Sequence, residues 1–258
     1  MLRVIKNFKK FRFLLLELVK KDIKLKYRRS YLGILWTLLE PLLTMIVLTV
    51  VFSGFYGKSD RSFPIYVLSG RLLYSFFSSC TKAACKSIRS NASIIKKVYV
   101  PKYIYPFASI IANYLIFMIS LTVLVVVSLA LGVYPTKHIF AAIIPLITLL
   151  FMTIGVGMVL ATMAVFFRDL EYLWDVMLML IMYSSAIFYN PAKVIKNGYG
   201  WIITYNPVYA CIANFRNAIY GSSIDRWSLY YSVGVAAVSV VVGLFVFYKK
   251  QDEFILNI

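Results

Sequence analysis

Two ionisable side chains lie inside long apolar stretches of the sequence, and these two residues are the best placed to do chemistry there. Glu40 stands in YLGILWTLLEPLL, directly before Pro41, and Arg71 stands in LSGRLLYSFF. An unpaired charge in hydrocarbon is costly, so such residues are rare and usually mark a functional or tightly packed position. The sequence therefore predicts polar sites near Glu40 and Arg71.

Each of these two residues has more than one interpretation. Glu40 is either a polar position on a subunit surface or a passage, or a helix-packing carboxyl that is protonated or hydrogen-bonded. Arg71 binds an anionic group of a substrate, extends outward to the membrane surface, or pairs with Glu40. The sequence leaves these alternatives open.

The usual catalytic motifs are missing from the chain. There is no G-x-x-x-x-G-K-[ST] phosphate loop, no HExxH and no GxSxG, and the one histidine, His138, is interpreted as solvated beside Lys137. Cys80, Cys85 and Cys211 have no metal-binding spacing, and acidic residues are too few for a proton relay. We expect no enzyme activity, no metal and no bound cofactor, so energy for any transport must come from a partner.

The composition indicates an integral membrane protein. Of 258 residues 61% are apolar and 15% charged, the mean hydropathy is +0.80, and apolar runs of about 20 residues recur. Such runs predict helices and not a barrel. The net charge of +18 comes from cations beside the apolar runs, which favours the membrane surface over nucleic acid as their partner. The N-terminus shows no cleavable signal peptide.

The expected fold is all-α, as a single transmembrane domain over residues 1–258. A basic amphipathic helix in residues 1–30 is expected to lie in the membrane interface. A cytoplasmic coupling segment is expected at 89–102 and short outer re-entrant half-helices at 190–227. The six predicted transmembrane helices are 31–55, 64–86, 104–132, 139–166, 172–189 and 228–248.

The distribution of Lys and Arg predicts the orientation. Eleven lie in residues 1–30 and six in 82–102; with Arg168, Lys249 and Lys250 these make 20 of the 28. Because cytoplasmic loops carry the excess of positive charge, both termini of this multi-pass membrane protein are expected in the cytoplasm.

Two connecting segments are unusual. Residues 89–102 place apolar side chains among lysines, which indicates either a docking segment or an ordinary positive loop. Residues 190–227 hold two apolar stretches too short to cross, rich in tyrosine and tryptophan. Those aromatic residues form a belt at the headgroup level or stack on sugar rings in an exit passage.

Four motifs resemble one known family. KDIKLKYRRSYLGILWTLLEPLL looks like the junction of the interface helix and first span in the permease subunits of type-2 ABC exporters for lipid-linked polysaccharides, which include O-antigen, capsule and wall teichoic acid exporters. IIKKVYVPKYIYP resembles the coupling segment, FFRDLEYLW the inner joint before span five, and NPVYACIANFRNAIYG the outer segment. The resemblance covers the whole chain.

The resemblance implies a homodimer with two separate ATPase subunits, which bind ATP and Mg, and a polyprenyl-pyrophosphate-linked glycan as substrate. ATP-driven closure would open a passage between the permeases. We expect ATPase coupling at Ile95, Lys96, Lys97, Val98, Tyr99, Pro101 and Lys102, and an interface-helix junction at Tyr27, Arg28, Arg29 and Ser30. The translocation pathway is expected near Trp36, Glu40, Arg71, Tyr74, Tyr183 and Tyr189. An outer gate is expected at Trp201, Tyr205, Tyr209 and Arg216.

Two alternatives remain at this stage. One is a type-2 ABC permease for a drug or another lipid, and the other is a membrane scaffold or lipid-modifying enzyme. The enzyme alternative needs convergent acid, base or metal groups, and the sequence offers almost none.

Overall fold

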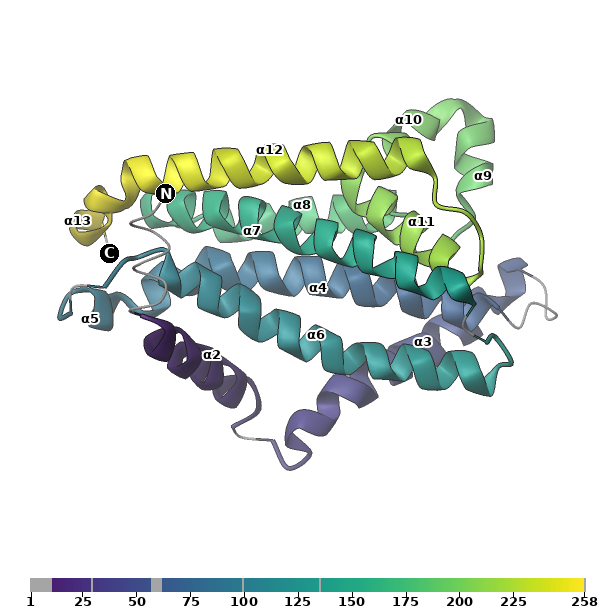
Figure 1. The fold of residues 1–258 in the computed structure, drawn as a ribbon, viewed down its shortest axis with the longest axis horizontal. Helices are drawn as coiled ribbons and strands as arrows, with labels where there is room; N and C mark the ends of the chain where they lie inside the picture. Colours follow the sequence, from purple (N-terminus) through teal and green to yellow (C-terminus); the bar gives the residue numbers. More distant parts are fainter. Residues whose placement is uncertain (1–10, 29, 57–61, 99, 135, 258) are drawn as a thin grey trace.

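The computed structural model describes residues 11–28, 30–56, 62–98, 100–134 and 136–257. In these ranges the chain is helical throughout, joined by short turns, and contains no strand, so the predicted all-α class is confirmed. The long helices run along one common direction (Figure 1). Predicted positions at residues 1–10, together with Arg29 and Tyr99, lie outside the described residues.

The long helices form the body of the molecule. They are α3 (Trp36–Tyr56), α4 (Phe63–Ser90), α6 (Ile104–Ala130), α7 (Ile143–Phe166), α8 (Leu170–Ser184) and α12 (Arg226–Lys250). The shorter elements are α2 (Arg12–Tyr27), η1 (Gly33–Leu35), α5 (Ala92–Ile95), η2 (Lys137–Ala142), α9 (Pro191–Val194), η3 (Ile195–Tyr199), α10 (Gly200–Thr204), α11 (Pro207–Ile219), η4 (Gln251–Glu253) and α13 (Phe254–Asn257). Figure 1 places α5 and α13 at one end and α9 and α10 at the opposite end.

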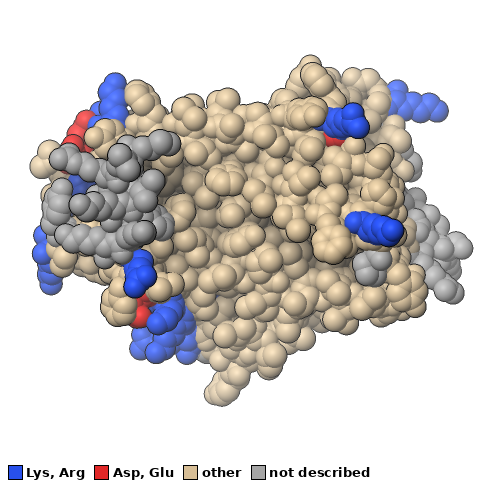
Figure 2. Space-filling model, in the orientation of Figure 1, with Lys and Arg blue, Asp and Glu red and all other residues tan. Residues whose placement is uncertain are grey.

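Four helical stretches of the described chain are long and apolar enough to cross a membrane. They are Gly33–Phe52, Ile104–Ala130, Lys137–Phe166 and Arg226–Asn257. On the face drawn in Figure 2, charged side chains gather toward the two ends of the molecule and leave an uncharged band between them. The band is what a protein needs where it contacts hydrocarbon.

Two predicted spans do not meet that criterion. α4 has 28 residues but carries Arg71, Lys82, Lys86 and Arg89. α8 has 15 residues and ends at Ser184, five residues before the predicted end, so at 1.5 Å per residue it reaches only about 22 Å of the ~30 Å of hydrocarbon. Four of the six predicted spans are therefore supported directly by length and composition.

The core lies along α4, which packs against α6 and α7 and has buried residues from Phe63 to Ile88. α3 is peripheral, since only 6% of the apolar window in Gly33–Phe52 is buried, against 39% for α6. The pair α7 and α12 makes the closest approach. A Cβ on Gly155 would overlap the backbone of Ser239, and one on Gly243 would overlap the backbone of Gly155. Glycine lets these two backbones touch, as small residues do in membrane helix pairs.

The helix α2 packs on the end of α6 instead of standing free. Leu15, Leu18 and Val19 are buried against it, and the Ser109 hydroxyl of α6 donates a hydrogen bond to the Asp22 carboxylate at 2.7 Å. The Lys21 amine donates to Asn91 Oδ1, at the end of α4, at 2.7 Å. These contacts attach the predicted interface helix to the body at several points.

Candidate functional site

A polar cavity of about 240 Å³ has Glu40 in its lining. It lies between the end of α2 and the helices α3, α4 and α6, and Lys26, Glu40 and Arg71 are its charged lining residues. Its other polar lining residues are Tyr27, Thr37, Thr44, Ser75, Ser79, Asn113 and Ser120. The structure thus brings Glu40 and Arg71, which are 31 positions apart in the sequence, to the lining of one open cavity, in which Glu40 is exposed and Arg71 half-buried.

Pro41 explains part of the polar lining. Proline has no N–H, so the carbonyl of Thr37, four residues earlier in α3, loses its helical partner. The Ser120 hydroxyl of α6 donates to this carbonyl at 2.9 Å. The Thr44 hydroxyl is shared between the carbonyls of Glu40, at 2.8 Å, and Pro41, at 3.0 Å. A neighbouring helix therefore satisfies the backbone that the proline frees, as membrane helices require.

The two cations of the cavity, Lys26 and Arg71, form no ion pair with its carboxylate, Glu40, among the described residues. Arg71 is half-buried, with Nη1 3.6 Å from the Met182 sulfur and its guanidinium 5.9 Å from the centre of the Tyr74 ring. The predicted alternative of an Arg71–Glu40 ion pair is absent here. Burial lowers the pKa of Lys26, and the Glu40 carboxylate acts against that effect by raising it.

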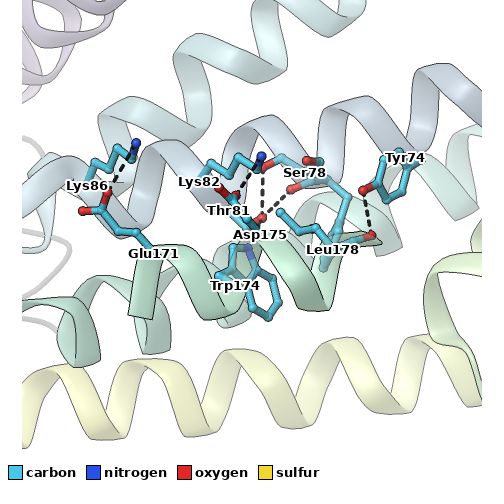
Figure 3. Close-up of polar contacts among 10 residues, drawn as sticks. Tyr74, Ser78, Thr81, Lys82, Lys86, Glu171, Trp174, Asp175 and Leu178 are labelled. Carbon is cyan, nitrogen blue, oxygen red and sulfur yellow. Dashed lines mark hydrogen bonds and ion pairs between the residues drawn. The ribbon is translucent and has the colours of Figure 1, made fainter. Parts of the chain in front are cut away.

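A ladder of polar contacts joins α4 to α8 (Figure 3). Toward the α5 end, Glu171 pairs with Arg89 and, at 3.3 Å, with Lys86, and Lys82 pairs with Asp175 at 2.8 Å. In the middle, the Trp174 indole donates to Thr81 Oγ1 at 3.0 Å and the Tyr74 hydroxyl donates to the Leu178 carbonyl at 2.8 Å.

The ladder holds α8 by one face only. The rest of α8 is apolar and exposed, including Tyr172, Leu173, Val176, Leu180 and Tyr183. The predicted pathway residue Tyr74 is therefore buried in the α4–α8 contact, whereas Tyr183 and, on α3, Trp36 are exposed.

The other end of α8 is held by Arg216 of α11. This side chain is 5% exposed. Its Nη1 donates to the Ala186 carbonyl at 3.1 Å, and its Nη2 donates to the Tyr66 carbonyl at 2.9 Å and the Ile187 carbonyl at 3.4 Å. Its guanidinium lies 3.4 Å from the centre of the Tyr66 ring. Among the described residues it has no carboxylate partner, so its charge is stabilised by carbonyls and one aromatic face.

Tyr66 and Asn206 extend this cluster, which we call the outer clamp (Tyr66, Ala186, Ile187, Asn206 and Arg216). The Tyr66 hydroxyl lies 2.8 Å from the Ala186 carbonyl and 2.9 Å from the Tyr189 carbonyl. Asn206 accepts from Val208 and Tyr209 N–H at the start of α11, and its amide donates to the hydroxyls of Ser184 and Ser185. The clamp fixes the point where α8 ends and the short outer helices begin.

The predicted outer-gate residues do not share one environment. Trp201 and Tyr205 are exposed, Tyr209 is half-buried, and Arg216 is buried in the outer clamp. The half-buried Tyr189 donates its hydroxyl to the Tyr183 carbonyl at 2.6 Å. The structure therefore separates a surface aromatic group from a buried arginine.

The predicted coupling segment begins inside α4, which continues to Ser90, and then turns through α5. Ile95 is buried, Lys96, Lys97 and Val98 are exposed, and Pro101 is half-buried. Lys102 donates to the Gln251 carbonyl and lies 5.8 Å from the Phe254 ring centre. Burial lowers the pKa of Lys102 and Asp252 raises it. The segment is attached to the C-terminal end of α12 and exposes a patch of lysines and valine.

The predicted interface-helix junction lies where α2 ends. Tyr27 is its last helical residue and lines the polar cavity, and Arg28 is exposed. Ser30 accepts a hydrogen bond from the Gly33 N–H at 3.3 Å, where the chain enters η1.

Sequence reasoning missed the α4–α8 ladder. Its signal was present, because Lys82 and Lys86 on α4, and Glu171 and Asp175 on α8, each repeat after four residues, which places each pair on one helix face. The described residues contain no group of three potential metal ligands, and the three cysteines are buried and free.

Comparisons with known proteins identify relatives over nearly the whole chain. The family described as ABC-2 type transporter matches residues 14–220. The O-antigen export system permease protein RfbA of Klebsiella pneumoniae is 30% identical over 245 residues, 93% of each chain. A protein of the same name from Myxococcus xanthus is 27% identical over 98% of each chain. The polysialic acid transport protein KpsM of Escherichia coli is 22% identical over 92% of this chain and 93% of its own.

Proposed function

Because the chain belongs to the ABC-2 type transporter family, we propose that it is the membrane-spanning subunit of an ATP-driven exporter for a polysaccharide or teichoic acid linked to polyprenyl pyrophosphate. The observation that carries this proposal is the end-to-end similarity to permeases named for O-antigen and polysialic acid export. The substrate would move from the cytoplasmic to the outer side of a bacterial plasma membrane.

The proposed topology has six spans and cytoplasmic termini. α4 and α8 would be the two spans that join the four apolar ones, since both lie along the body of the molecule beside α7. The short α8 would need the outer short helices to reach the far membrane surface. The end that carries α5 and α13 would face the cytoplasm, where the excess of lysine and arginine is expected.

We propose that two copies of the chain act with two separate ATPase subunits that bind ATP and Mg. The exposed Lys96, Lys97 and Val98 after α5 suit contact with an ATPase. Lys102 and its contacts with Gln251 and Phe254 would pass movement of this segment to α12.

The polar cavity and the exposed face of α8 are the proposed surfaces of the translocation pathway. Glu40 and Arg71 would meet polar or anionic groups of the passing substrate, and Trp36 and Tyr183 offer exposed aromatic faces. Trp201, Tyr205 and Tyr209 stand near the proposed exit, and Arg216 would position that exit through the outer clamp.

Depletion of the protein, followed by identification of the lipid-linked polymer that accumulates inside the cell, tests the proposed function. We expect a polyprenyl-pyrophosphate glycan to accumulate and to be exported again on complementation with the wild-type gene. When the depleted cells are complemented with a variant in which the charges of Lys96 and Lys97 are reversed, the protein should be present at its normal level but export should not resume. The control is a variant with the charge reversed at the exposed Lys249. Accumulation of a drug or an unglycosylated lipid would overturn the assignment.

A further inference from the structure

A second groove lies beside the polar cavity and shares Tyr27 and Thr37 with its lining. Its volume is about 620 Å³, and it runs between the last turns of α2, the chain that enters α3, and Ile119 of α6. Its floor is apolar, with Ile23, Leu32, Ile34, Leu35 and Leu38 among its lining residues. Sites for small ligands have similar sizes, roughly 300–1,000 Å³.

Three cations stand along the rim of this groove. Lys20, Lys24 and Arg28 repeat every four residues, so they occupy one face of α2 and its C-terminal end. Lys20 pairs with Glu17 at 2.9 Å, whereas Lys24 and Arg28 make no ion pair within the described part of the chain. Figure 2 shows blue side chains gathered at the lower left, where Figure 1 places α2.

Apolar residues are exposed directly beside these cations. Leu32 is 43% exposed, Ile34 54% and Leu35 55%. A soluble anion would use the cations and leave these side chains in water, and a neutral lipid would cover them but leave the charges unmatched. A molecule with a phosphate next to an acyl chain satisfies both parts of the groove.

We propose that this groove binds one anionic phospholipid of the leaflet in which α2 lies. Its phosphate would contact Lys24 and Arg28, and one acyl chain would cover Ile34 and Leu35. The lipid would fill the space between α2 and α3 and so join the interface helix to the first span. This site goes beyond the proposed export function and does not depend on which substrate is exported.

The test uses the full-length protein in nanodiscs with photo-crosslinkable phosphatidylglycerol or phosphatidylcholine of identical acyl chains at equal mole fraction. Cross-links in residues 20–38 should favour phosphatidylglycerol. Lys24→Gln with Arg28→Gln should weaken its binding there roughly thirty-fold, the fold-change that corresponds to about 1 kcal/mol for each cation near the membrane surface. Arg168→Gln with Lys249→Gln removes two other exposed cations and should change nothing at this site.

Further arms separate the parts of the site. Leu35→Gln changes an exposed side chain, so the protein should fold, and it should reduce cross-linking of both lipids. Equal labelling of residues 20–38 by the two lipids would overturn the proposal. Unchanged phosphatidylglycerol labelling in the Lys24→Gln, Arg28→Gln variant would also overturn it. Complete displacement of phosphatidylglycerol by inorganic phosphate would do the same, because it would indicate a site for a soluble anion. Lys24→Gln alone should give an intermediate loss.

Discussion

The two ends of α8 are held against the rest of the protein by different interactions. Toward α5, Lys82 and Asp175 form an ion pair in which the two side chains are 45% and 56% exposed, so solvent screens much of their attraction. Glu171, one turn earlier in α8, is 19% exposed and pairs with Lys86 and Arg89. At the other end, Arg216 is buried and donates to backbone carbonyls that have no water to replace it. The same helix is therefore held by ion pairs between side chains at one end and by hydrogen bonds from a buried arginine to backbone carbonyls at the other.

This difference suggests which end of α8 can move. An ion pair between exposed side chains, such as Lys82 with Asp175, forms and breaks at little cost in free energy. The exposed apolar face of α8 makes no contact with the described part of the chain that would hold this end of the helix further. The outer clamp instead holds the residues after Ser184, where Ala186 adopts a left-handed φ of 44°. The comparison predicts that the loss in free energy of unfolding on substitution rises from Lys82 through Tyr74 to Arg216. We call this rise the gradient.

The largest effect is expected at Arg216. Arg216→Met removes the guanidinium hydrogen bonds to the carbonyls of Ala186, Tyr66 and Ile187 in a buried site, which should lower the free energy of unfolding by about 2–4 kcal/mol. Arg216→Lys should lose less, because a lysine can still donate to one carbonyl. Thermal unfolding in detergent measures both variants. Arg226→Met, at an exposed arginine at the start of α12, is the control, and equal stability of Arg216→Met and wild type would contradict the clamp.

Gly70→Ala should have the next largest effect. A Cβ at this position of α4 would overlap Arg216 Nη2, so the guanidinium must leave its carbonyls, at an expected cost of about 1–3 kcal/mol. A double-mutant cycle checks the cause, because Gly70→Ala should cost much less when Arg216 is already methionine. Additive costs would mean that Gly70 acts through some other contact.

Tyr74→Phe tests the middle of α8. The substitution removes the hydroxyl that donates to Leu178 and keeps the ring in place, so the expected loss of stability is about 1 kcal/mol. Chemical denaturation or thermal unfolding in the same detergent gives the value. A cost as large as that of Arg216→Met would remove the gradient.

Lys82→Met should have the smallest effect, about 0.5 kcal/mol or less, since the Lys82–Asp175 pair is half exposed. The exchanged pair, Lys82→Asp with Asp175→Lys, should restore wild-type stability, whereas Asp175→Lys alone should not. Export by the exchanged pair is a separate readout. A loss of more than about 2 kcal/mol for Lys82→Met would place this end of α8 in the same class as the outer clamp.

The sequence predicts the helices of this protein better than their ends. Apolar runs of span length mark α6, α7 and α12. The freed carbonyl at Thr37 could be expected from Pro41 alone, but its partner, Ser120, is 83 residues away and only the fold brings it near. The helix α8 ends at Ser184 although apolar residues continue past it, because the contacts at its end come from Tyr66 and Arg216, which are distant in the sequence.

Among the site residues, too, some could be identified from local sequence and others only from the fold. Glu40 and Arg71 could be singled out as charges in apolar runs, and both line one cavity. Arg216 was expected at an outer gate because its segment resembles the outer segment of the exporter family, but its burial depends on the carbonyls of a helix end that no local pattern reveals. The ladder was missed because its charged residues look like the solvated ends of two separate helices.

The contact of Gly155 with Gly243 has a mechanical consequence. Two helices that meet through long side chains can shift along each other by changing rotamers, but two backbones in direct contact have no such compliance. We therefore expect α7 and α12 to resist sliding along each other and to move together. Since Lys102 donates to Gln251, directly after α12, a displacement of the coupling segment would pass into this pair of helices, whereas α3 and α8, which have exposed apolar faces, are freer to shift.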